Sequence, residues 1–295
     1  MTTEVFHNPQ IRKVFVVSGG RTATTLFGHR LTDAFPGIYS IHEPDRIDAA
    51  RSGAHGTASA LAGQGLWRMG FLKGLGCAGT RNLSLKRARA AIDRQAALDW
   101  LVADRRHLGE IDCDVYVEAN YQLFGVVPDL VTLPNSHVVL LLRDPSTWIQ
   151  SWLKKKWYSQ DDWLTRLDAL GMKRITPRNV GKPDDRWQSF SRTEKLAWVW
   201  GYLADGFVGQ HAANPERISL YRFEDVTAPG SETKGLKSQF LAVFLGHEPE
   251  QDELNLYDKM IGHRDNATTG RNQDVILPDW FTTQYGDLLA QFNYG

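Results

Sequence analysis

The 295-residue sequence contains few cysteines and has no excess of charge of either sign. Cys77 and Cys113 are its only cysteines; they are too few for a metal cluster and suggest no disulfide framework, so we expect a reducing compartment. The 34 lysines and arginines balance 34 aspartates and glutamates, and the formal net charge is zero. Because no bulk field draws such a chain to nucleic acid, we predict no nucleic-acid partner, and any basic site must be local.

Long apolar runs are also missing from the sequence. No stretch approaches the roughly 18 apolar residues that a membrane-spanning helix needs, so we expect no membrane insertion. The N-terminal MTTEVFHNPQ is polar, and we expect a core strand to start by Lys13, which leaves no room for a signal peptide or membrane anchor. We therefore expect a cytoplasmic protein. Since 42% of the residues are hydrophobic, the chain can nevertheless bury a core.

The most informative stretch runs from Lys13 to Phe27, KVFVVSGGRTATTLF. Its first part, Val14 to Val17, is short, apolar and rich in β-branched residues, which is typical of a buried strand. Gly19 and Gly20 then allow a tight turn close to a ligand, and the amphipathic run to about Phe35 predicts a helix that opens out of this loop. A strand, a glycine loop and a helix N-terminus together form an anion site, because free amides and the helix dipole favour negative charge.

Side chains in the same loop favour a phosphate or sulfate ligand. The hydroxyls of Thr22, Thr24 and Thr25 add donors, and the guanidinium of Arg21 has a fork suited to such oxyanions. The pattern differs from the P-loop of nucleoside-triphosphate enzymes, GxxxxGK followed by serine or threonine, because no lysine precedes the hydroxyl pair. On this stretch alone, an ordinary strand–turn–helix corner with polar turn residues stays open as the alternative.

Strands and helices alternate along the rest of the chain. We predict strands at Gly37 to Ile41, Asp114 to Glu118, His137 to Leu142 and Ile218 to Tyr221. Two helices have a predicted N-cap: one runs from Ser84, its N-cap, to about Arg105, and one starts at Pro145 after the N-cap Asp144. We predict further helices at about Leu123 to Leu133, Asp161 to Leu170, Thr193 to His211, Leu236 to Leu245 and Trp280 to Phe292. We expect loops at Lys173 to Trp187, on the surface, and at His263 to Gln273. The alternation predicts one α/β domain over residues 1–295, with a parallel sheet of about five strands and helices on both faces.

Polar residues follow several of these strands, at the edge where parallel sheets bind ligands: Arg21, Glu43, Asn120 and Arg143. Ser151 lies eight residues after Arg143, on the following helix. Its hydroxyl would face the Arg143 guanidinium if the intervening loop folds over, because the helix places Ser151 two turns in. An arginine and a serine that converge at a strand end would form a second phosphate site. The alternative is a surface arginine and an unrelated helix serine.

Two anion sites on one sheet suit a nucleotide with phosphates at both ends, and the two motifs resemble those of sulfotransferases that use 3′-phosphoadenosine 5′-phosphosulfate (PAPS). The run from Arg21 to Thr25, RTATT, is similar to the 5′-phosphosulfate loop of that family, a lysine or arginine followed by SGTT. Ala23 stands in place of its glycine, which costs the loop some freedom. The run LLLRDPSTWIQSW, with Arg143 and Ser151, is similar to the 3′-phosphate motif with its spacing intact.

Three shorter matches extend the resemblance over about residues 13–292, with 45–110 and 158–190 unmatched. His42-Glu43-Pro44 is similar to an acidic turn of many members, and Leu220 to Val226, LYRFEDV, is similar to a late strand ending in YED. Gly270-Arg271 is placed like a glycine with a basic neighbour in a loop over the 3′-phosphate.

The resemblance implies a P-loop-like sulfotransferase fold and transfer of a sulfuryl group from PAPS to a hydroxyl or amine of a small-molecule or carbohydrate acceptor, with no metal. Arg21 would neutralise charge as the sulfuryl bond breaks, and Glu43 would take the acceptor proton, with His42 as the next candidate. The segments 45–110 and 158–190 would be insertions on the acceptor side. The implied donor-binding residues are Ser18, Gly19, Gly20, Arg21, Thr22, Ala23, Thr24, Thr25, Arg143, Ser151, Tyr221, Gly270 and Arg271.

Alternatives stay open for the roles and for the function. Glu43 could cap a turn or pair with Arg46, and on a regular strand only one of His42 and Glu43 would face the site. A P-loop-type small-molecule kinase is opposed by the missing lysine and by the lack of a clear acidic magnesium-binding strand; a nucleotide-binding protein without activity is the third reading. The composition favours a small alcohol, phenol or sugar over a polyanion as acceptor, and the oligomeric state stays unknown. Three tryptophans could line an acceptor cleft rather than the core: Trp67, Trp152 and Trp157.

Overall fold

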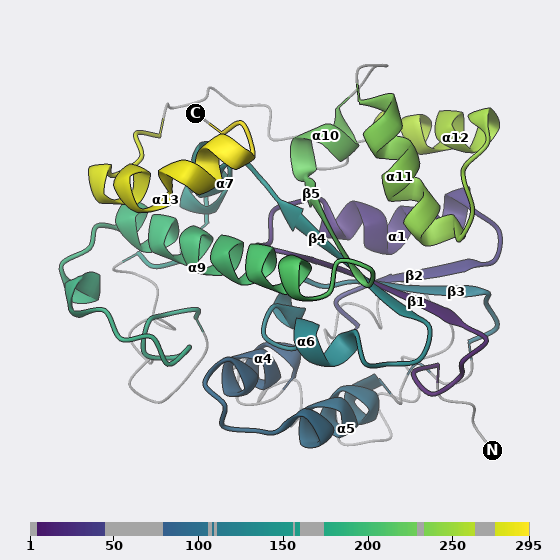
Figure 1. The fold of residues 1–295 in the computed structure, drawn as a ribbon, viewed down its shortest axis with the longest axis horizontal. Helices are drawn as coiled ribbons and strands as arrows, with labels where there is room; N and C mark the ends of the chain where they lie inside the picture. Colours follow the sequence, from purple (N-terminus) through teal and green to yellow (C-terminus); the bar gives the residue numbers. More distant parts are fainter. Residues whose placement is uncertain are drawn as a thin grey trace.

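The computed structural model describes residues 5–44, 79–105, 108, 111–155, 157–159, 174–228, 233–262 and 275–294. Within them, five parallel strands form one sheet in the order β2-β3-β1-β4-β5. The strands are β1 (Arg12–Ser18), β2 (Ile38–His42), β3 (Val115–Ala119), β4 (Ser136–Leu142) and β5 (Ile218–Arg222). Helices cover both faces of the sheet (Figure 1), so the predicted single-domain α/β fold class is confirmed.

The middle of the sheet is apolar because it is covered on both faces. In β1 every residue after Arg12 is buried, and in β4 every residue except His137. Such near-continuous burial is typical of the central strands of a parallel sheet. Because the strands are parallel, the loops that follow Ser18, Ala119 and Leu142 emerge at one edge. We call this the carboxyl edge and the opposite one the amino edge.

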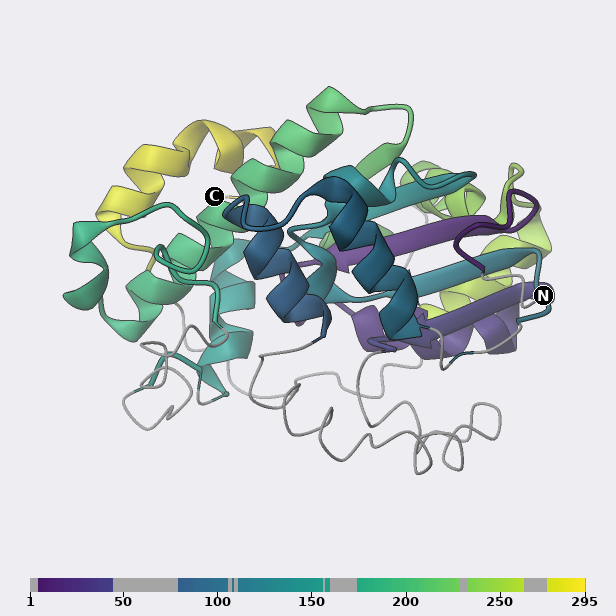
Figure 2. The ribbon, with the colours of Figure 1, turned by 90° about the horizontal axis from the view of Figure 1, so that it is seen from below.

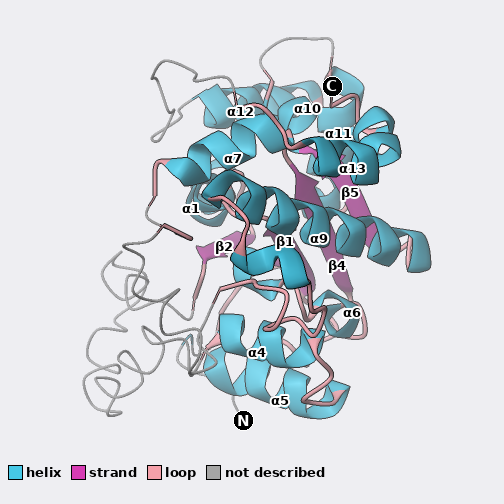
Figure 3. Ribbon diagram, turned by 90° about the vertical axis from the view of Figure 1, so that its left-hand side faces the viewer, coloured by secondary structure: helices cyan, strands magenta, loops and turns pink. Residues whose placement is uncertain are grey.

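Two cores lie on opposite faces of the sheet. One is covered by α1 (Thr24–Ala34), α10 (Phe223–Thr227), α11 (Lys234–Leu245) and α12 (Gln251–Gly262). The other is covered by α4 (Thr80–Ala88), α5 (Arg94–Arg105), α6 (Val127–Leu130), α7 (Pro145–Leu153), α9 (Arg192–Ala213) and α13 (Asp279–Gln291). Figure 2 shows α4 and α5, in blue, in front of the sheet, and Figure 3 shows them at the bottom, with α10, α11 and α12 at the top. Two short 3₁₀ helices are η3 (Tyr121–Leu123) and η5 (Asp185–Gln188).

Elements with strong local signals match their predicted positions. The four later strands begin and end within one residue of the predicted bounds. Asp144 is the N-cap of α7, as predicted, because its Oδ1 accepts a hydrogen bond from the N–H of Thr147 at 2.8 Å, and Pro145 opens the helix. No helix in the described ranges is both long and apolar enough to span a bilayer.

The predicted helix from Ser84 to Arg105 is wrong. It consists of two helices, α4 and α5, and the backbone of Ala90 between them is left-handed with a φ of 54°. Ser84 is not an N-cap: it lies inside α4, fully buried, and its Oγ donates to the carbonyl oxygen of Gln122 at 2.6 Å. A left-handed alanine gives no sequence signal, which is why periodicity alone joined the two helices.

Other segments also depart from their predicted structure. The predicted helix at 123–133 is shorter, with η3 followed by α6. The predicted surface loop 173–187 contains the buried residues Arg174, Thr176, Asn179 and Val180, so much of it packs into the fold. The sequence analysis missed α12, and the predicted helix at 161–170 and loop at 263–273 lie outside the described residues.

Candidate active site

The loop between β1 and α1 is tightly packed around Gly20. Ser18 Oγ accepts a hydrogen bond from the Gly20 N–H at 3.1 Å, and Trp148 Nε1 donates to the Gly20 carbonyl oxygen at 2.9 Å. The φ of Gly20 is 76°, and a Cβ there would lie 2.9 Å from Trp152 Cζ2. Glycine is therefore required at this position for its conformation and for the close approach of an indole ring.

The start of α1 lacks the partners that a helix terminus usually has. Its N-cap, Ala23, has a φ of 53° and makes no side-chain capping bond, so the first amides of α1 receive no acceptor from it. Thr22 Oγ1 is buried and has no hydrogen-bond partner among the described residues. An unpaired buried hydroxyl costs about 1–3 kcal/mol, and an oxyanion here would satisfy both the hydroxyl and the helix amides. The residues present thus fit the 5′-phosphate end of PAPS.

Arg21 joins the loop to the predicted second phosphate site. Its backbone is left-handed, with a φ of 58°, and its Nε donates to the Oγ of the buried Ser151 at 2.9 Å. Arg143 Nη1 donates to the carbonyl oxygen of Arg21 at 2.7 Å, and Arg143 Nε donates to Thr147 Oγ1 at 3.1 Å. The structure therefore brings Arg21, Arg143 and Ser151 together, with the Ser151 hydroxyl bonded to Arg21.

The junction of β4 and α7 fixes the position of Arg143. Trp200 Nε1, from α9, donates to the Arg143 carbonyl oxygen at 2.8 Å. The next residue, Asp144, donates its N–H to Glu224 Oε1 at 3.0 Å, and the hydroxyl of Tyr294 donates to Glu224 Oε2 at 3.1 Å. Three elements far apart in sequence thus hold the backbone from which Arg143 extends.

The side chains of His42 and Glu43 lie in contact, so they do not point to opposite faces as they would on a regular strand. Glu43 has a φ of 43°, which ends the strand alternation, and His42 Nε2 lies 3.3 Å from Glu43 Oε1. His42 Nδ1 lies 3.0 Å from the Ala119 carbonyl oxygen, which only accepts, so Nδ1 carries a hydrogen. Nε2 lies 3.3 Å from both Thr25 Oγ1 and Glu43 Oε1, so His42 connects the predicted base to the start of α1.

A fully buried carboxylate anchors the neighbouring strand, β3. Glu118 of β3 forms a two-point ion pair with Arg105 of α5, whose Nε lies 3.0 Å from Oε2. Tyr116 donates to Glu118 Oε2 at 3.1 Å, and Asn120 Nδ2 donates to Oε1 at 3.0 Å. Burial, followed by the charge of Glu118, raises the pKa of Tyr116 well above its ordinary value. Loss of one partner of a buried ion pair is strongly destabilising, so Glu118 stays in place. Because Asn120 is hydrogen-bonded to Glu118, its side chain is held in place as well.

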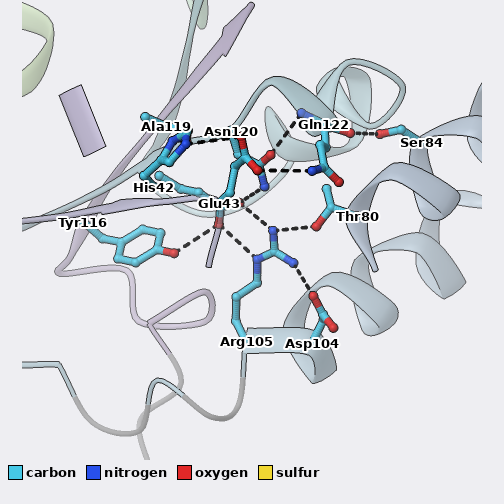
Figure 4. Close-up of polar contacts among 11 residues, drawn as sticks. His42, Glu43, Thr80, Ser84, Asp104, Arg105, Tyr116, Ala119, Asn120 and Gln122 are labelled. Carbon is cyan, nitrogen blue, oxygen red and sulfur yellow. Dashed lines mark hydrogen bonds and ion pairs between the residues drawn. The ribbon is translucent and has the colours of Figure 1, made fainter. Parts of the chain in front are cut away.

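From Asn120 the hydrogen bonds continue to the predicted base (Figure 4). Asn120 Oδ1 accepts from the N–H of Gln122 at 3.0 Å, and Gln122 Nε2 donates to Glu43 Oε2 at 3.3 Å. The carbonyl oxygen of Gln122 accepts from Ser84 of α4. Glu43, which is 3% exposed, is therefore oriented by Gln122 of η3, which is itself held by α4. Sequence reasoning missed Gln122 and Arg105; the available signal was Glu118, a charged residue inside an apolar strand.

The remaining residues that were predicted to bind PAPS either pack against other parts of the fold or lie outside the described residues. A Cβ at Gly19 would lie 2.9 Å from Trp148 Nε1, and Thr24 is buried at the start of α1. Tyr221 lies on β5, which β4 separates from β1, and its ring packs against Phe240 of α11 at 5.3 Å between centroids. Gly270, Arg271 and Trp67 fall outside the described residues. In the described part of the chain, no group of three or more metal-ligating side chains could hold a metal ion.

Comparison with known proteins gives matches to solved structures and none by sequence. No family model matches the sequence, and no curated protein matches it. Among solved structures, the fold is similar to the crystal structure of sulfotransferase STF9 from Mycobacterium avium, with a TM-score of 0.52 and 13% sequence identity over 99% of this chain and 79% of that chain. At this identity the likeness concerns the fold alone.

Proposed function

We propose that the protein transfers a sulfuryl group from PAPS to a hydroxyl or amine of a small-molecule or carbohydrate acceptor. The observation that carries this proposal is the meeting of Arg21, Arg143 and Ser151 at the carboxyl edge, beside a helix start without a cap. Two anion-binding features this close suit one ligand with two phosphate ends. The sulfotransferase fold supports the same reading.

At the donor loop, the amides of α1 and the hydroxyls of Thr22, Thr24 and Thr25 would hold the 5′-phosphate. PAPS supplies the activated sulfuryl group, and such transfer asks the protein for in-line positioning and charge stabilisation. Arg21 is suited to the second task, because its hydrogen bond to Ser151 uses Nε and leaves the two terminal nitrogens for oxygens of the donor. Arg143 and Ser151 would hold the 3′-phosphate, with Tyr221, Gly270 and Arg271 as further predicted contacts.

At the acceptor side, Glu43 would take the proton of the attacking group. Gln122 holds one of its oxygens and the other lies 3.3 Å from His42 Nε2, so the carboxylate that would accept the proton is held in a fixed orientation. The packing of α4, from the predicted insertion 45–110, against Gln122 supports a role of that insertion on the acceptor side; we propose the same for 158–190. A cytoplasmic location stays a prediction from the sequence.

The test is transfer of labelled sulfur from PAPS to a panel of phenols, alcohols, amines and sugars. We expect labelled product with at least one acceptor and none from ATP labelled at the γ-phosphate with magnesium. Phosphoryl transfer from ATP would establish the kinase alternative instead. Tight binding of 3′,5′-bisphosphoadenosine without turnover on any acceptor would favour a nucleotide-binding protein without activity.

A further inference from the structure

A cluster of cations and aromatic rings borders the donor loop. We call it the Arg81 cluster: Arg81 at the start of α4, Tyr121 of η3, Trp152 at the end of α7, Trp157 and Arg174. The Trp152 and Trp157 ring centroids are 4.3 Å apart. The guanidinium carbons of Arg81 and Arg174 lie 5.1 Å and 3.7 Å from the Trp157 centroid.

The cluster adjoins both the loop and the predicted base. A Cβ at Gly20 would lie 2.9 Å from Trp152 and 3.4 Å from Tyr121, so these two rings form a wall of the loop. Arg81 donates a hydrogen bond to the Tyr121 hydroxyl, and Gln122, the next residue along the chain, donates to the Glu43 carboxylate. A molecule held by Arg81 would therefore lie near both Gly20 and Glu43, where an acceptor has to be.

Among the residues that the structure describes, Arg81 has no acidic partner and the indole nitrogen of Trp152 has no acceptor. Within the described residues, Arg81 contacts Tyr121 and Trp157, and no carboxylate lies within ion-pair distance of it. Trp152 is 6% exposed, and its Nε1 has no hydrogen-bond partner in the described part of the chain. That nitrogen is bonded to the same ring carbon, Cε2, as the Cζ2 atom that meets Gly20, so it lies on the edge of the indole nearest the loop.

We propose that Arg81 binds one anionic group, a carboxylate or sulfonate-like oxyanion, of a flat acceptor whose ring packs against the Arg81 cluster. This rests on the proposed sulfuryl transfer and narrows its acceptor. Arg81 is a permanent cation, and its partners in the described part of the chain, Tyr121 and Trp157, carry no charge, which favours one added negative charge. A guanidinium also binds planar oxyanions at two points, and the rings provide stacking surface.

Three phenols test whether the site prefers an acceptor with one negative charge. They are 4-hydroxyphenylacetate, 4-hydroxyphenylmethanesulfonate and the neutral 4-hydroxyphenylacetamide. Each is titrated calorimetrically into full-length protein saturated with 3′,5′-bisphosphoadenosine. We expect at least one anionic probe to bind about tenfold or more tightly than the amide, the range for a charge-assisted hydrogen bond. The two anionic probes distinguish a carboxylate from a sulfonate site.

Lys86 provides a matched control on the same helix. Its Nζ lies 4.7 Å from the Trp100 centroid, so Lys86→Gln removes an equal charge and a similar ring contact away from the donor loop. Arg81→Gln should abolish the preference for the anionic probe, Arg81→Lys should keep part of it, and Lys86→Gln should keep all of it. Binding of bisphosphoadenosine should be unchanged in all three variants.

Equal affinity of the wild-type protein for charged and neutral probes overturns the proposal. An equal loss of the preference for the anionic probe in Arg81→Gln and Lys86→Gln also overturns it, because the preference would then come from the overall charge of the protein. Weaker bisphosphoadenosine binding in Arg81→Gln would assign Arg81 to the donor and overturn it as well. If the wild-type protein does not bind bisphosphoadenosine, the proposed function fails separately; the same probes, titrated into the free protein, then decide the role of Arg81.

Discussion

The two edges of the sheet differ in whether their buried polar groups have hydrogen-bond partners among the described residues. At the amino edge, the fully buried Lys13 donates hydrogen bonds from Nζ to the carbonyl oxygens of Asn8, Ile11 and Pro134, at 2.6, 2.9 and 2.8 Å. At the carboxyl edge, the buried Thr22 hydroxyl and the Trp152 indole nitrogen have no partner among the described residues.

The backbone differs in the same sense. The carboxyl edge carries left-handed φ angles at Arg21, Ala23 and Glu43, whereas the described amino edge has one at a residue other than glycine, Asn135, a residue type that tolerates this conformation. Such conformations cost of order 1 kcal/mol or more each and concentrate at functional sites. We therefore propose that the amino edge stabilises the fold, whereas the unsatisfied donors and strained backbone of the carboxyl edge bind a ligand. The following predictions test this division.

Replacement of Arg21 should have the largest effect. Arg21→Ala removes a cation at the point where sulfuryl charge develops, so turnover should fall by roughly 10³-fold, with some loss of donor affinity. The measurement is steady-state kinetics with PAPS. The control is Arg186→Ala, which removes an exposed arginine on η5. Retained turnover in Arg21→Ala would place the reacting group elsewhere.

The second effect concerns donor affinity alone. Arg143→Ala should weaken binding of 3′,5′-bisphosphoadenosine by about 2–4 kcal/mol, as expected for loss of a partly buried charged contact. Ser151→Ala removes a neutral hydroxyl and should cost about 1 kcal/mol. Calorimetric titration measures both. Wild-type affinity in both variants would mean that the 3′-phosphate site is misplaced.

Glu43→Gln should separate the acceptor chemistry from donor binding. The amide keeps the shape and nearly all donor affinity, but turnover should fall by roughly 10²-fold, the typical contribution of a general base. The loss should shrink for a phenol whose hydroxyl is already acidic. If the variant keeps wild-type turnover on a weakly acidic alcohol, Glu43 is not the base, and His42→Ala is the next test.

At the amino edge, Lys13→Met should affect stability only. It removes the donor of three carbonyl oxygens, one of them on the buried Ile11, so the free energy of unfolding should fall by about 2 kcal/mol. Bisphosphoadenosine affinity of the folded variant should not change. Chemical denaturation and calorimetry measure the two quantities, and a loss of affinity without a loss of stability would erase the contrast between the edges.

Thr22→Val should have the smallest effect and the opposite sign. It removes an unpaired buried hydroxyl at nearly constant volume, so the free protein should become more stable by about 1 kcal/mol while bisphosphoadenosine binding weakens. Thermal unfolding with and without the nucleotide measures both changes. A destabilised free protein would show that the hydroxyl already has a partner.

Local sequence signals predicted the fold and the loop between β1 and α1, but not which side chains contact one another across the fold. The strand Val14 to Val17, the glycines after it and the Asp144–Pro145 helix start each depend on neighbours in sequence, and all three are found. The bonds Arg21–Ser151 and Gln122–Glu43 join residues 130 and 79 positions apart, which no local pattern encodes.

A second reason is backbone conformation. The contact between His42 and Glu43 depends on a left-handed glutamate, and the break between α4 and α5 on a left-handed alanine. Neither residue type favours that conformation, so tertiary packing sets it.

The most direct test of the account is calorimetric titration of the wild-type protein with 3′,5′-bisphosphoadenosine and, separately, with ATP and magnesium, repeated on the double variant Arg21→Ala/Arg143→Ala. We predict one bisphosphoadenosine site per chain, much weaker binding of ATP, and loss of bisphosphoadenosine binding in a double variant that still unfolds cooperatively. Tighter binding of ATP with magnesium, or full bisphosphoadenosine affinity in the double variant, would contradict a donor site at the carboxyl edge.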